Sequence, residues 1–135
     1  MPKTIGIGLT GGIAAYKIAD LVSRLKKEGF EVIVMMTDAA KQFITPLTLE
    51  VLSGKQVIDS LWNEDSAGVV KHIAIAEQVD LLVVAPATAN FIAKAAHGIA
   101  DDLLTTVFVA NTAPVLIVPS MNNNMYSNRI VQENL

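Results

Sequence analysis

Cysteine is absent from this chain of 135 residues, and histidine occurs only at His72 and His97. The lack of cysteine excludes a disulfide framework and a thiolate metal site, and two histidines are too few for a closed zinc site. We therefore expect no bound metal. Charged residues make up only 17% of the chain, the net charge is -3, and Lys and Arg form no cluster. This pattern provides no electrostatic footprint for nucleic acid or for an anionic membrane surface, so neither partner is expected.

Long apolar runs are also missing, because no segment reaches membrane-spanning length. The N-terminus lacks the charged and apolar regions of a secretory signal, so a cytoplasmic protein is expected. The length suits a single domain over residues 1–135. Hydrophobic residues make up 52% of the chain, slightly more than in an average soluble domain. This excess indicates that another subunit covers part of the apolar surface.

Strand-length apolar segments alternate with helical patterns along the chain. Residues 4–9 and 31–37 predict two strands, and the continuous apolar runs at 80–88 and 113–121 predict two more that are buried on both faces. Helical patterns occupy the connections, and residues 63–68 have the composition of a polar loop. This alternation predicts an α/β fold with a doubly wound parallel sheet and helices on both faces.

The segments that follow the predicted strands are rich in Gly, Thr, Ser and Asn. In chain order their sequences are TGGI, TDAA, PATAN and PSMNNNM. Ligands of open α/β sheets bind beyond the carboxyl ends of the strands. These four segments are therefore expected to form the binding site.

A G-x-G-x-x-G pattern, which is typical of dinucleotide-binding sites, occurs at Gly6, Gly8 and Gly11. Gly6 and Gly8 fall inside the first predicted strand, where they are expected to admit a closely packed neighbour, and not in the turn that follows it. The turn itself is Thr10–Gly12. It is either an anion site at a helix N-terminus or only a tight turn, and the glycines alone do not distinguish the two.

Three separate stretches carry a more specific signal: TGGIAAYK (10–17), PATANFIAKAAHGIADDLLTT (86–106) and PSMNNNMY (119–126). In order and spacing they resemble the homo-oligomeric flavin-containing cysteine decarboxylases, and among these the enzymes that act on phosphopantothenoylcysteine. The resemblance implies a flavodoxin-like (Rossmann-like) fold that binds flavin mononucleotide (FMN). It also implies assembly into trimers or multiples of trimers, with each flavin near a subunit boundary.

The same resemblance implies which residues contact the flavin. They fall in the four segments that follow the predicted strands: Gly11, Gly12 and Ile13; Thr37 and Ala39 on the phosphate side; Thr88, Ala89, Asn90 and Phe91; and Ser120. From the residues alone, Asn90 is as well suited to capping a helix as to binding a ligand.

His72 and Asn122 match the catalytic positions of the family. A histidine base is suited to managing the substrate thiol proton near neutral pH, although a histidine at a helix start needs no such role. Asn122 matches the residue that holds the substrate carboxylate, and asparagine is also a preferred helix N-cap. His97 is expected at a helix C-terminus, and Asp101 and Asp102 in the first turn of the next helix. Tyr16 and Phe43 are expected in the core or at an interface.

The implied function is FMN-dependent decarboxylation of 4'-phosphopantothenoylcysteine to 4'-phosphopantetheine in coenzyme A biosynthesis. A fused or associated phosphopantothenate–cysteine ligase domain is a further implied partner. One alternative is a non-catalytic FMN-binding subunit. Another is a flavin prenyltransferase, from which the combination of His72 with PSMNNNM points away.

Family members carry a cysteine in a substrate clamp downstream of the PxMNxxM motif, and this cysteine is the expected proton donor for the last reduction. The chain contains no cysteine and ends at Leu135, so we expect it to lack the clamp and to be a piece of a longer protein. We predict that these 135 residues bind the flavin and reduce the enethiol intermediate poorly or not at all. Mass spectrometry of the product tests this, and efficient formation of saturated phosphopantetheine would contradict it.

Overall fold

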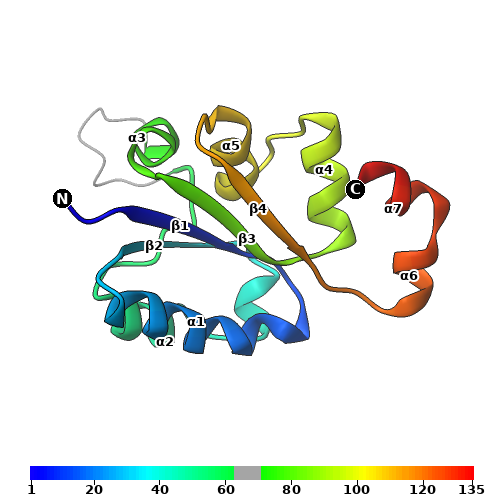
Figure 1. Ribbon diagram of the computed structural model, residues 1–135. Helices are drawn as coiled ribbons and strands as arrows, with labels where there is room; N and C mark the ends of the chain where they lie inside the picture. Colours follow the sequence, from blue (N-terminus) through cyan, green and yellow to red (C-terminus); the bar gives the residue numbers. More distant parts are fainter. Residues whose placement is uncertain (63–70) are drawn as a thin grey trace.

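The computed structural model describes residues 1–62 and 71–135, and a parallel sheet of four strands forms its centre (Figure 1). The strands are β1 (Thr4–Leu9), β2 (Glu31–Met36), β3 (Leu81–Ala87) and β4 (Val115–Pro119), in the order β2-β1-β3-β4. The chain therefore winds outward from β1 in both directions, as in flavodoxin-like sheets. The predicted α/β fold with a doubly wound sheet is confirmed.

Helices cover both faces of this sheet. The helical elements are η1 (Ile13–Ala15), α1 (Tyr16–Lys27), η2 (Ala40–Gln42), α2 (Pro46–Ser53), α3 (Lys71–Gln78), α4 (Ala89–His97), α5 (Leu103–Ala110), α6 (Asn123–Ser127) and α7 (Arg129–Asn134). Figure 1 shows α1 and α2 on one face, with α3 and α5 on the other. Among the described helices, none has the length and apolar character needed to cross a membrane. The predicted loop at 63–68 lies outside the described residues.

The ends of the helices follow from local sequence signals. Thr45 caps α2 through its hydroxyl, Pro46 begins that helix, and Gly54 ends it in the left-handed conformation at φ 74°. Asp102 caps α5, because its carboxylate accepts from the Thr105 amide while the Thr105 hydroxyl accepts from the Asp102 amide. The prediction that Asp101 and Asp102 lie in the first helical turn was thus wrong, because α5 begins at Leu103, Asp102 is its N-cap and Asp101 precedes the cap.

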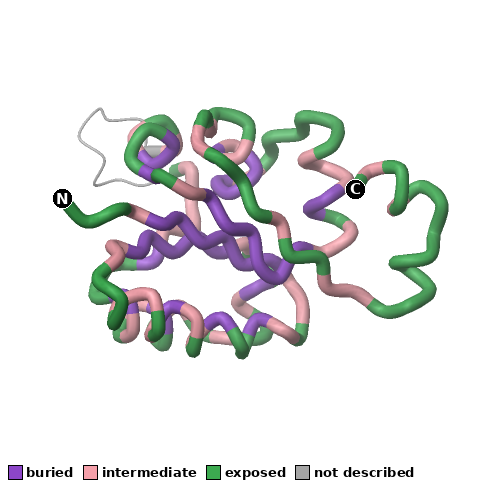
Figure 2. The backbone as a smooth tube through the Cα atoms, viewed as in Figure 1, coloured by how far each residue is buried: buried purple, intermediate pink, exposed green. Residues whose placement is uncertain are grey.

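Two apolar cores lie on opposite faces of the sheet, whose central strands Figure 2 shows as buried. The side chains of β1 explain the difference between the two cores. Ile5, Ile7 and Leu9 point into the core beneath α1 and α2. Gly6 and Gly8 face the other core, where a Cβ at Gly6 would lie 2.8 Å from Val79 Cγ1. A Cβ at Gly8 would overlap the buried side chain of Leu104 in α5. The two glycines therefore admit close neighbours, as predicted.

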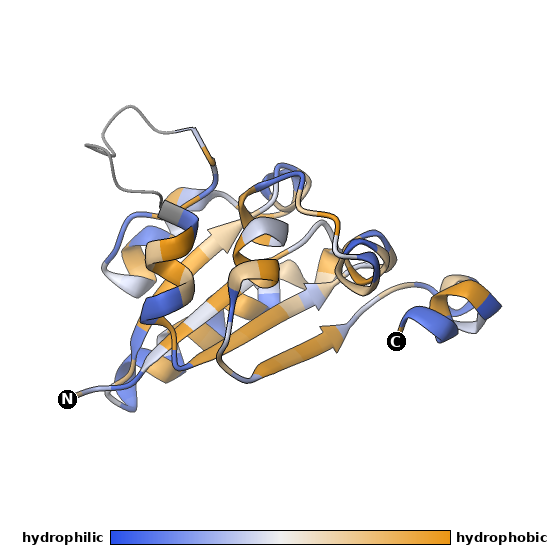
Figure 3. Ribbon diagram, turned by 90° about the horizontal axis from the view of Figure 1, so that it is seen from above, coloured by the Kyte–Doolittle hydropathy of each residue, from blue (hydrophilic) through white to orange (hydrophobic). Residues whose placement is uncertain are grey.

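The last strand is not buried as its apolar sequence predicts. β4 forms one edge of the sheet, and Val115, Leu116 and Val118 are 41%, 52% and 44% exposed. Figure 3 shows this hydrophobic strand at the border of the sheet, with the C-terminal helices extending past it. Tyr16 and Phe43 are also exposed, so neither is a core residue. The structure leaves substantial apolar surface open, which is consistent with the expectation of a subunit partner.

Replacing Gly8 with valine should overpack the core beside Leu104 and lower the free energy of unfolding by about 1–3 kcal/mol. Urea denaturation monitored by circular dichroism measures the change. Gly12→Ala is the matched control, because a Cβ at Gly12 would meet Pro86 Cγ at an ordinary 3.5 Å. Equal stability of the Gly8→Val variant and the unaltered chain would contradict the close packing of β1 on α5.

Candidate binding site at the carboxyl ends of the strands

A cavity of about 450 Å³ opens at the carboxyl ends of the strands. Its volume lies within the range of small-molecule and cofactor sites, roughly 300–1,000 Å³. It is formed by the segments after β1, β2 and β3, by the start of α5 and by α6. The lining residues are Thr10, Gly11, Met36, Thr37, Asp38, Ala39, Asp59, Thr88, Asn90, Phe91, Lys94, Asp102, Leu103, Thr105 and Met125.

Thr10 joins the two central strands at the base of this cavity. Its buried hydroxyl donates to the carbonyl of Pro86 at 2.5 Å and accepts from the amide of Thr88 at 3.0 Å. The carboxyl ends of β1 and β3 are where the strand order of a doubly wound sheet reverses. One side chain therefore fixes the spacing of two of the four segments at the binding edge.

The first two segments touch at Gly11 and Ala39. A Cβ at Gly11 would lie 2.5 Å from Ala39 Cβ and 3.2 Å from the Ala39 carbonyl carbon. Because backbone stands on one side of the contact, only glycine fits there without displacing the segment after β2. The Gly11 turn is therefore required for close approach, and its part in ligand binding remains a prediction.

The third segment starts helix α4 at the cavity. Thr88 is the N-cap, and its hydroxyl accepts from the Phe91 amide at 3.2 Å. Asn90 is thus not the cap, and its exposed side chain lines the cavity instead. The first amides of this nine-residue helix face the ligand side, where the helix dipole favours an anion.

Charged groups on the far wall are held in pairs. The Lys94 ammonium donates to both carboxylate oxygens of Asp101, at 2.9 and 3.1 Å. This hydrogen bond lowers the pKa of the Asp101 carboxyl below its usual value. Asp102 is engaged by Thr105, whose amide and hydroxyl donate to Asp102 Oδ1 at 2.8 and 2.7 Å. The Lys94–Asp101 pair ties α4 to the segment before α5, and the Asp102–Thr105 pair caps α5 itself.

The remaining wall is apolar. Met36, Phe91, Leu103 and Met125 supply it. The Phe91 ring is fixed from behind by an edge-to-face contact with Phe108, with ring centroids 5.6 Å apart. A cavity with one apolar wall, several hydroxyls and a helix N-terminus suits a flat aromatic ligand that carries an anionic group.

Six of the ten predicted flavin contacts line this cavity: Gly11, Thr37, Ala39, Thr88, Asn90 and Phe91. The other four, Gly12, Ile13, Ala89 and Ser120, adjoin these residues in the chain or across the sheet without lining it. Ser120, for example, lies beside the end of β3, where its amide donates to the Ala87 carbonyl at 3.0 Å. The prediction of flavin contacts stays a prediction for all ten.

Sequence reasoning did not find Met36, Asp59, Lys94 or Thr105 as cavity residues. The D-x-x-T spacing at the start of α5 is the signal of a capping box, and it could have located Thr105. Asp59 could not have been found, because it reaches the cavity only through the bridge that aligns Ile58 with Met35 of β2.

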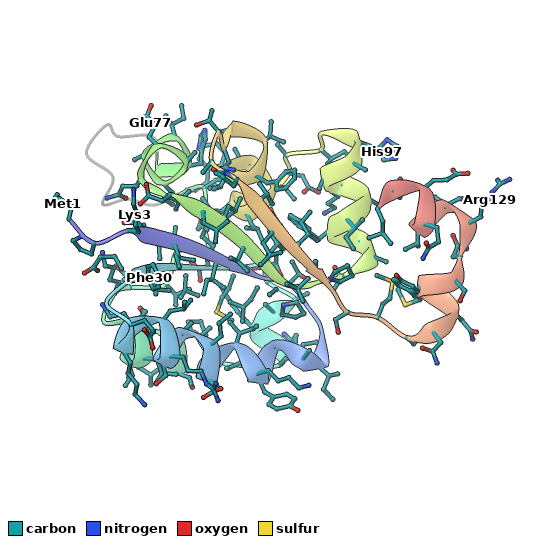
Figure 4. All side chains as sticks on the ribbon, viewed as in Figure 1. Met1, Lys3, Phe30, Glu77, His97 and Arg129 are labelled. Carbon is teal, nitrogen blue, oxygen red and sulfur yellow. The ribbon has the colours of Figure 1, made fainter. Side chains whose placement is uncertain are left out.

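Neither predicted catalytic residue lines the cavity within this single chain. His72 is half-buried in the first turn of α3. Asn122 is exposed and caps α6, with its side-chain oxygen accepting from the Met125 amide at 2.9 Å. This cap leaves the amide NH₂ of Asn122 available as a donor. His97 ends α4 as predicted, at the end of the helix far from the cavity (Figure 4).

Fold and cavity together define an α/β protein of the flavodoxin-like class, with its ligand cavity at the β1/β3 switch point. Residues 1–135 match the family model described as Flavoprotein, and the chain belongs to this family.

Curated relatives narrow the comparison. The chain is 49% identical over 137 residues to a probable phosphopantothenoylcysteine decarboxylase of Streptococcus mutans, covering 100% of this chain and 76% of the relative. It is 52% identical over 133 residues to the coenzyme A biosynthesis bifunctional protein CoaBC of Vibrio vulnificus, covering 98% of this chain. The chain spans only 33% of that bifunctional relative.

Solved structures have the same fold. The FMN-dependent cysteine decarboxylase SpaF superposes with a TM-score of 0.92 at 36% identity, covering 98% of this chain and 76% of that one. A PPC decarboxylase variant complexed with pantothenoylaminoethenethiol gives a TM-score of 0.83 at 28% identity, covering 99% of this chain and 75% of that one. The expected flavodoxin-like fold and family membership are thus confirmed.

Replacing Thr10 with valine should leave the half-buried Thr88 amide without its acceptor and the Pro86 carbonyl without its donor, and lower the free energy of unfolding by about 1–3 kcal/mol. Thr10→Ser, which keeps the hydroxyl, is the control and should retain most of the stability. Chemical denaturation of both variants measures the difference. A loss of stability in Thr10→Ser with none in Thr10→Val would show that the threonine methyl group, not the hydrogen bond, is what matters.

Proposed function

We propose that this chain binds FMN in the cavity at the carboxyl ends of β1, β2 and β3, and that it decarboxylates 4'-phosphopantothenoylcysteine to 4'-phosphopantetheine in coenzyme A biosynthesis. The observation that carries the proposal is the convergence of six motif-predicted residues, from three separate segments, on one cavity of about 450 Å³. The 49% identity over the whole chain to a probable phosphopantothenoylcysteine decarboxylase supports the choice of substrate.

The cavity residues fit a flavin. Phe91, Leu103 and Met125 offer an apolar wall for an isoalloxazine ring. The space kept free by Gly11 would be filled by any side chain, since even a Cβ there meets Ala39 at 2.5 Å. The volume of the cavity is sufficient for a ligand of this class.

Hydrogen-bond donors for the phosphate come from the chain itself. The Thr37 hydroxyl oxygen accepts from the Ala40 amide at 3.2 Å, so its own hydrogen is free to donate toward the cavity that Thr37 lines. The amides of Ala89 and Asn90 at the start of α4 add donors aligned with the helix dipole. These groups would hold a phosphate without a direct lysine or arginine contact.

When bound, the flavin supplies the redox chemistry that gives the carbanion formed on loss of carbon dioxide an electron sink. The chain's own residues orient the substrate and handle its protons. His72 would accept the thiol proton, because histidine is the side chain that acts most often as a general base. Asn122 would donate its NH₂ to the substrate carboxylate while its oxygen continues to cap α6, so the two roles proposed for this residue are compatible.

A homotrimer, or a multiple of trimers, would account for the open apolar surface. It would also account for the absence of His72 from the cavity lining of a single chain. Ile13 and Tyr16, which follow the Gly11 turn, are 76% and 60% exposed, and Phe43, just past the Ala39 segment, is 49% exposed. A second copy that covers this surface would enclose the cavity and add its own side chains. We further propose a cytoplasmic location and a fused or associated phosphopantothenate–cysteine ligase domain.

The purified chain should be yellow, with the absorbance spectrum of a bound flavin, or should take up added FMN. His72→Asn should retain the flavin and release carbon dioxide from the substrate at least about 100-fold more slowly, because the proton acceptor is lost. His97→Asn is the matched control and should leave the rate unchanged.

Other outcomes would select the alternatives. Flavin uptake without any substrate-dependent carbon dioxide release would indicate a non-catalytic FMN-binding subunit. A change in the flavin spectrum that requires dimethylallyl phosphate would indicate a flavin prenyltransferase. A colourless protein that takes up no FMN would overturn the proposal.

A further inference from the structure

Two carboxylates lie on the wall where the phosphate of FMN is proposed to bind. Asp38 and Asp59 both line the cavity, and Asp38 stands between Thr37 and Ala39 on the proposed phosphate side. A phosphate dianion next to two uncompensated carboxylates would be repelled. The repulsion is stronger from Asp59, whose side chain is 36% exposed, than from Asp38, whose side chain is 98% exposed and screened by solvent. Binding of a phosphorylated ligand therefore needs a cation near this wall.

Lys41 is that cation. Its ammonium lies 2.5 Å from Asp59 Oδ2 and 3.7 Å from Asp38 Oδ1. The hydrogen bond to Asp59 raises the pKa of the Lys41 amine, against the opposing effect of its partial burial. Lys41 is therefore charged at neutral pH, and it contacts two carboxylates of the cavity wall without lining the cavity itself.

The fold brings these three groups together from two separate segments. Lys41 is in η2, directly after the Thr37–Ala39 turn. Asp59 follows Ile58, whose amide donates to Val34 and whose carbonyl accepts from Met36, so this segment runs beside β2. The lysine therefore spans from the turn after β2 to the strand-like segment at the edge of the sheet.

Other charges at the cavity are already matched. Lys94 is engaged by Asp101, and the Asp102 carboxylate caps α5, where the helix dipole is positive. Among the described residues that line the cavity, Lys94 is the only basic side chain. Lys41 is therefore the cation that compensates the negative charges of Asp38 and Asp59.

We infer that Lys41 neutralises the carboxylates of Asp38 and Asp59 and thereby makes this wall of the cavity compatible with the phosphate of FMN. Lys41 is a specificity-determining residue in this role: it affects phosphorylated ligands and leaves the uncharged analogue riboflavin unaffected. The inference rests on the proposed binding of FMN.

The test compares the dissociation constants of FMN and riboflavin for the unaltered chain and for Lys41→Met, measured by flavin fluorescence titration. Lys41→Met should weaken FMN binding by about tenfold at low salt, because two carboxylates lose their cation. The loss should shrink at high salt, where charges are screened. Riboflavin affinity should not change, since it carries no phosphate.

Two control variants separate charge from structure. Asp59→Asn removes a carboxylate from the cavity wall and keeps Lys41, so FMN affinity should rise. Lys55→Met breaks a pair of similar exposure, with Lys55 Nζ 3.2 Å from Glu31 Oε2, at the opposite end of β2. This variant should bind both flavins as the unaltered chain does.

Each other outcome overturns the inference. Equal loss of FMN and riboflavin affinity in Lys41→Met, or an equal loss of FMN affinity in Asp59→Asn, would mean that the ion pair acts only by holding the loop. Unchanged FMN affinity in Lys41→Met would refute the role of Lys41 in phosphate binding and leave the proposed function standing. Failure of the unaltered chain to bind either flavin would refute the proposed function, and the inference with it.

Discussion

The hydrogen bonds of Thr10 are the constraint on which the binding edge of this protein depends. β1 and β3 are joined along their length by the ordinary ladder of a parallel sheet, which fixes register but not the path of the segments that follow. The buried Thr10 hydroxyl extends the connection past the ladder to Pro86 and Thr88. Because Thr88 also caps α4, the same bond orients the helix N-terminus toward the cavity. A single side chain thus couples sheet, turn and helix.

Glycine has two distinct roles around this centre. Gly6 and Gly8 let helices on one face approach β1 closely, which makes room for Val79 and Leu104. Gly11 lets the turn after β1 touch the segment after β2. These three residues form a G-x-G-x-x-G pattern in the sequence, but they do not share one role in the fold. Packing explains the first two, and the shape of the cavity explains the third.

Much of the fold was predictable because its signals are local or periodic. The apolar runs located all four strands, and Pro46, Gly54 and Gly98 located helix ends. The sequence left two alternatives open at Asn90 and gave a wrong expectation for β4, because in both cases a local signal had two solutions. Asn90 and Thr88 are both good caps, and only the hydrogen bond from Phe91 selects Thr88. The apolar sequence of β4 suits a central strand, but the strand order leaves it at an edge.

The sequence by itself determined the α/β class, the family and the four segments at the binding edge, because these depend on periodicity and on motifs read in order along the chain. Only the tertiary structure decided which side chains share the cavity. Asp59 reaches the cavity because its segment forms a bridge beside β2, and Lys94 reaches it because of the position of α4. The pairing of Lys41 with Asp59 could not be predicted from the sequence either. The two residues are far apart in the chain, and only the packing of the Asp59 segment against the edge strand β2 brings them together.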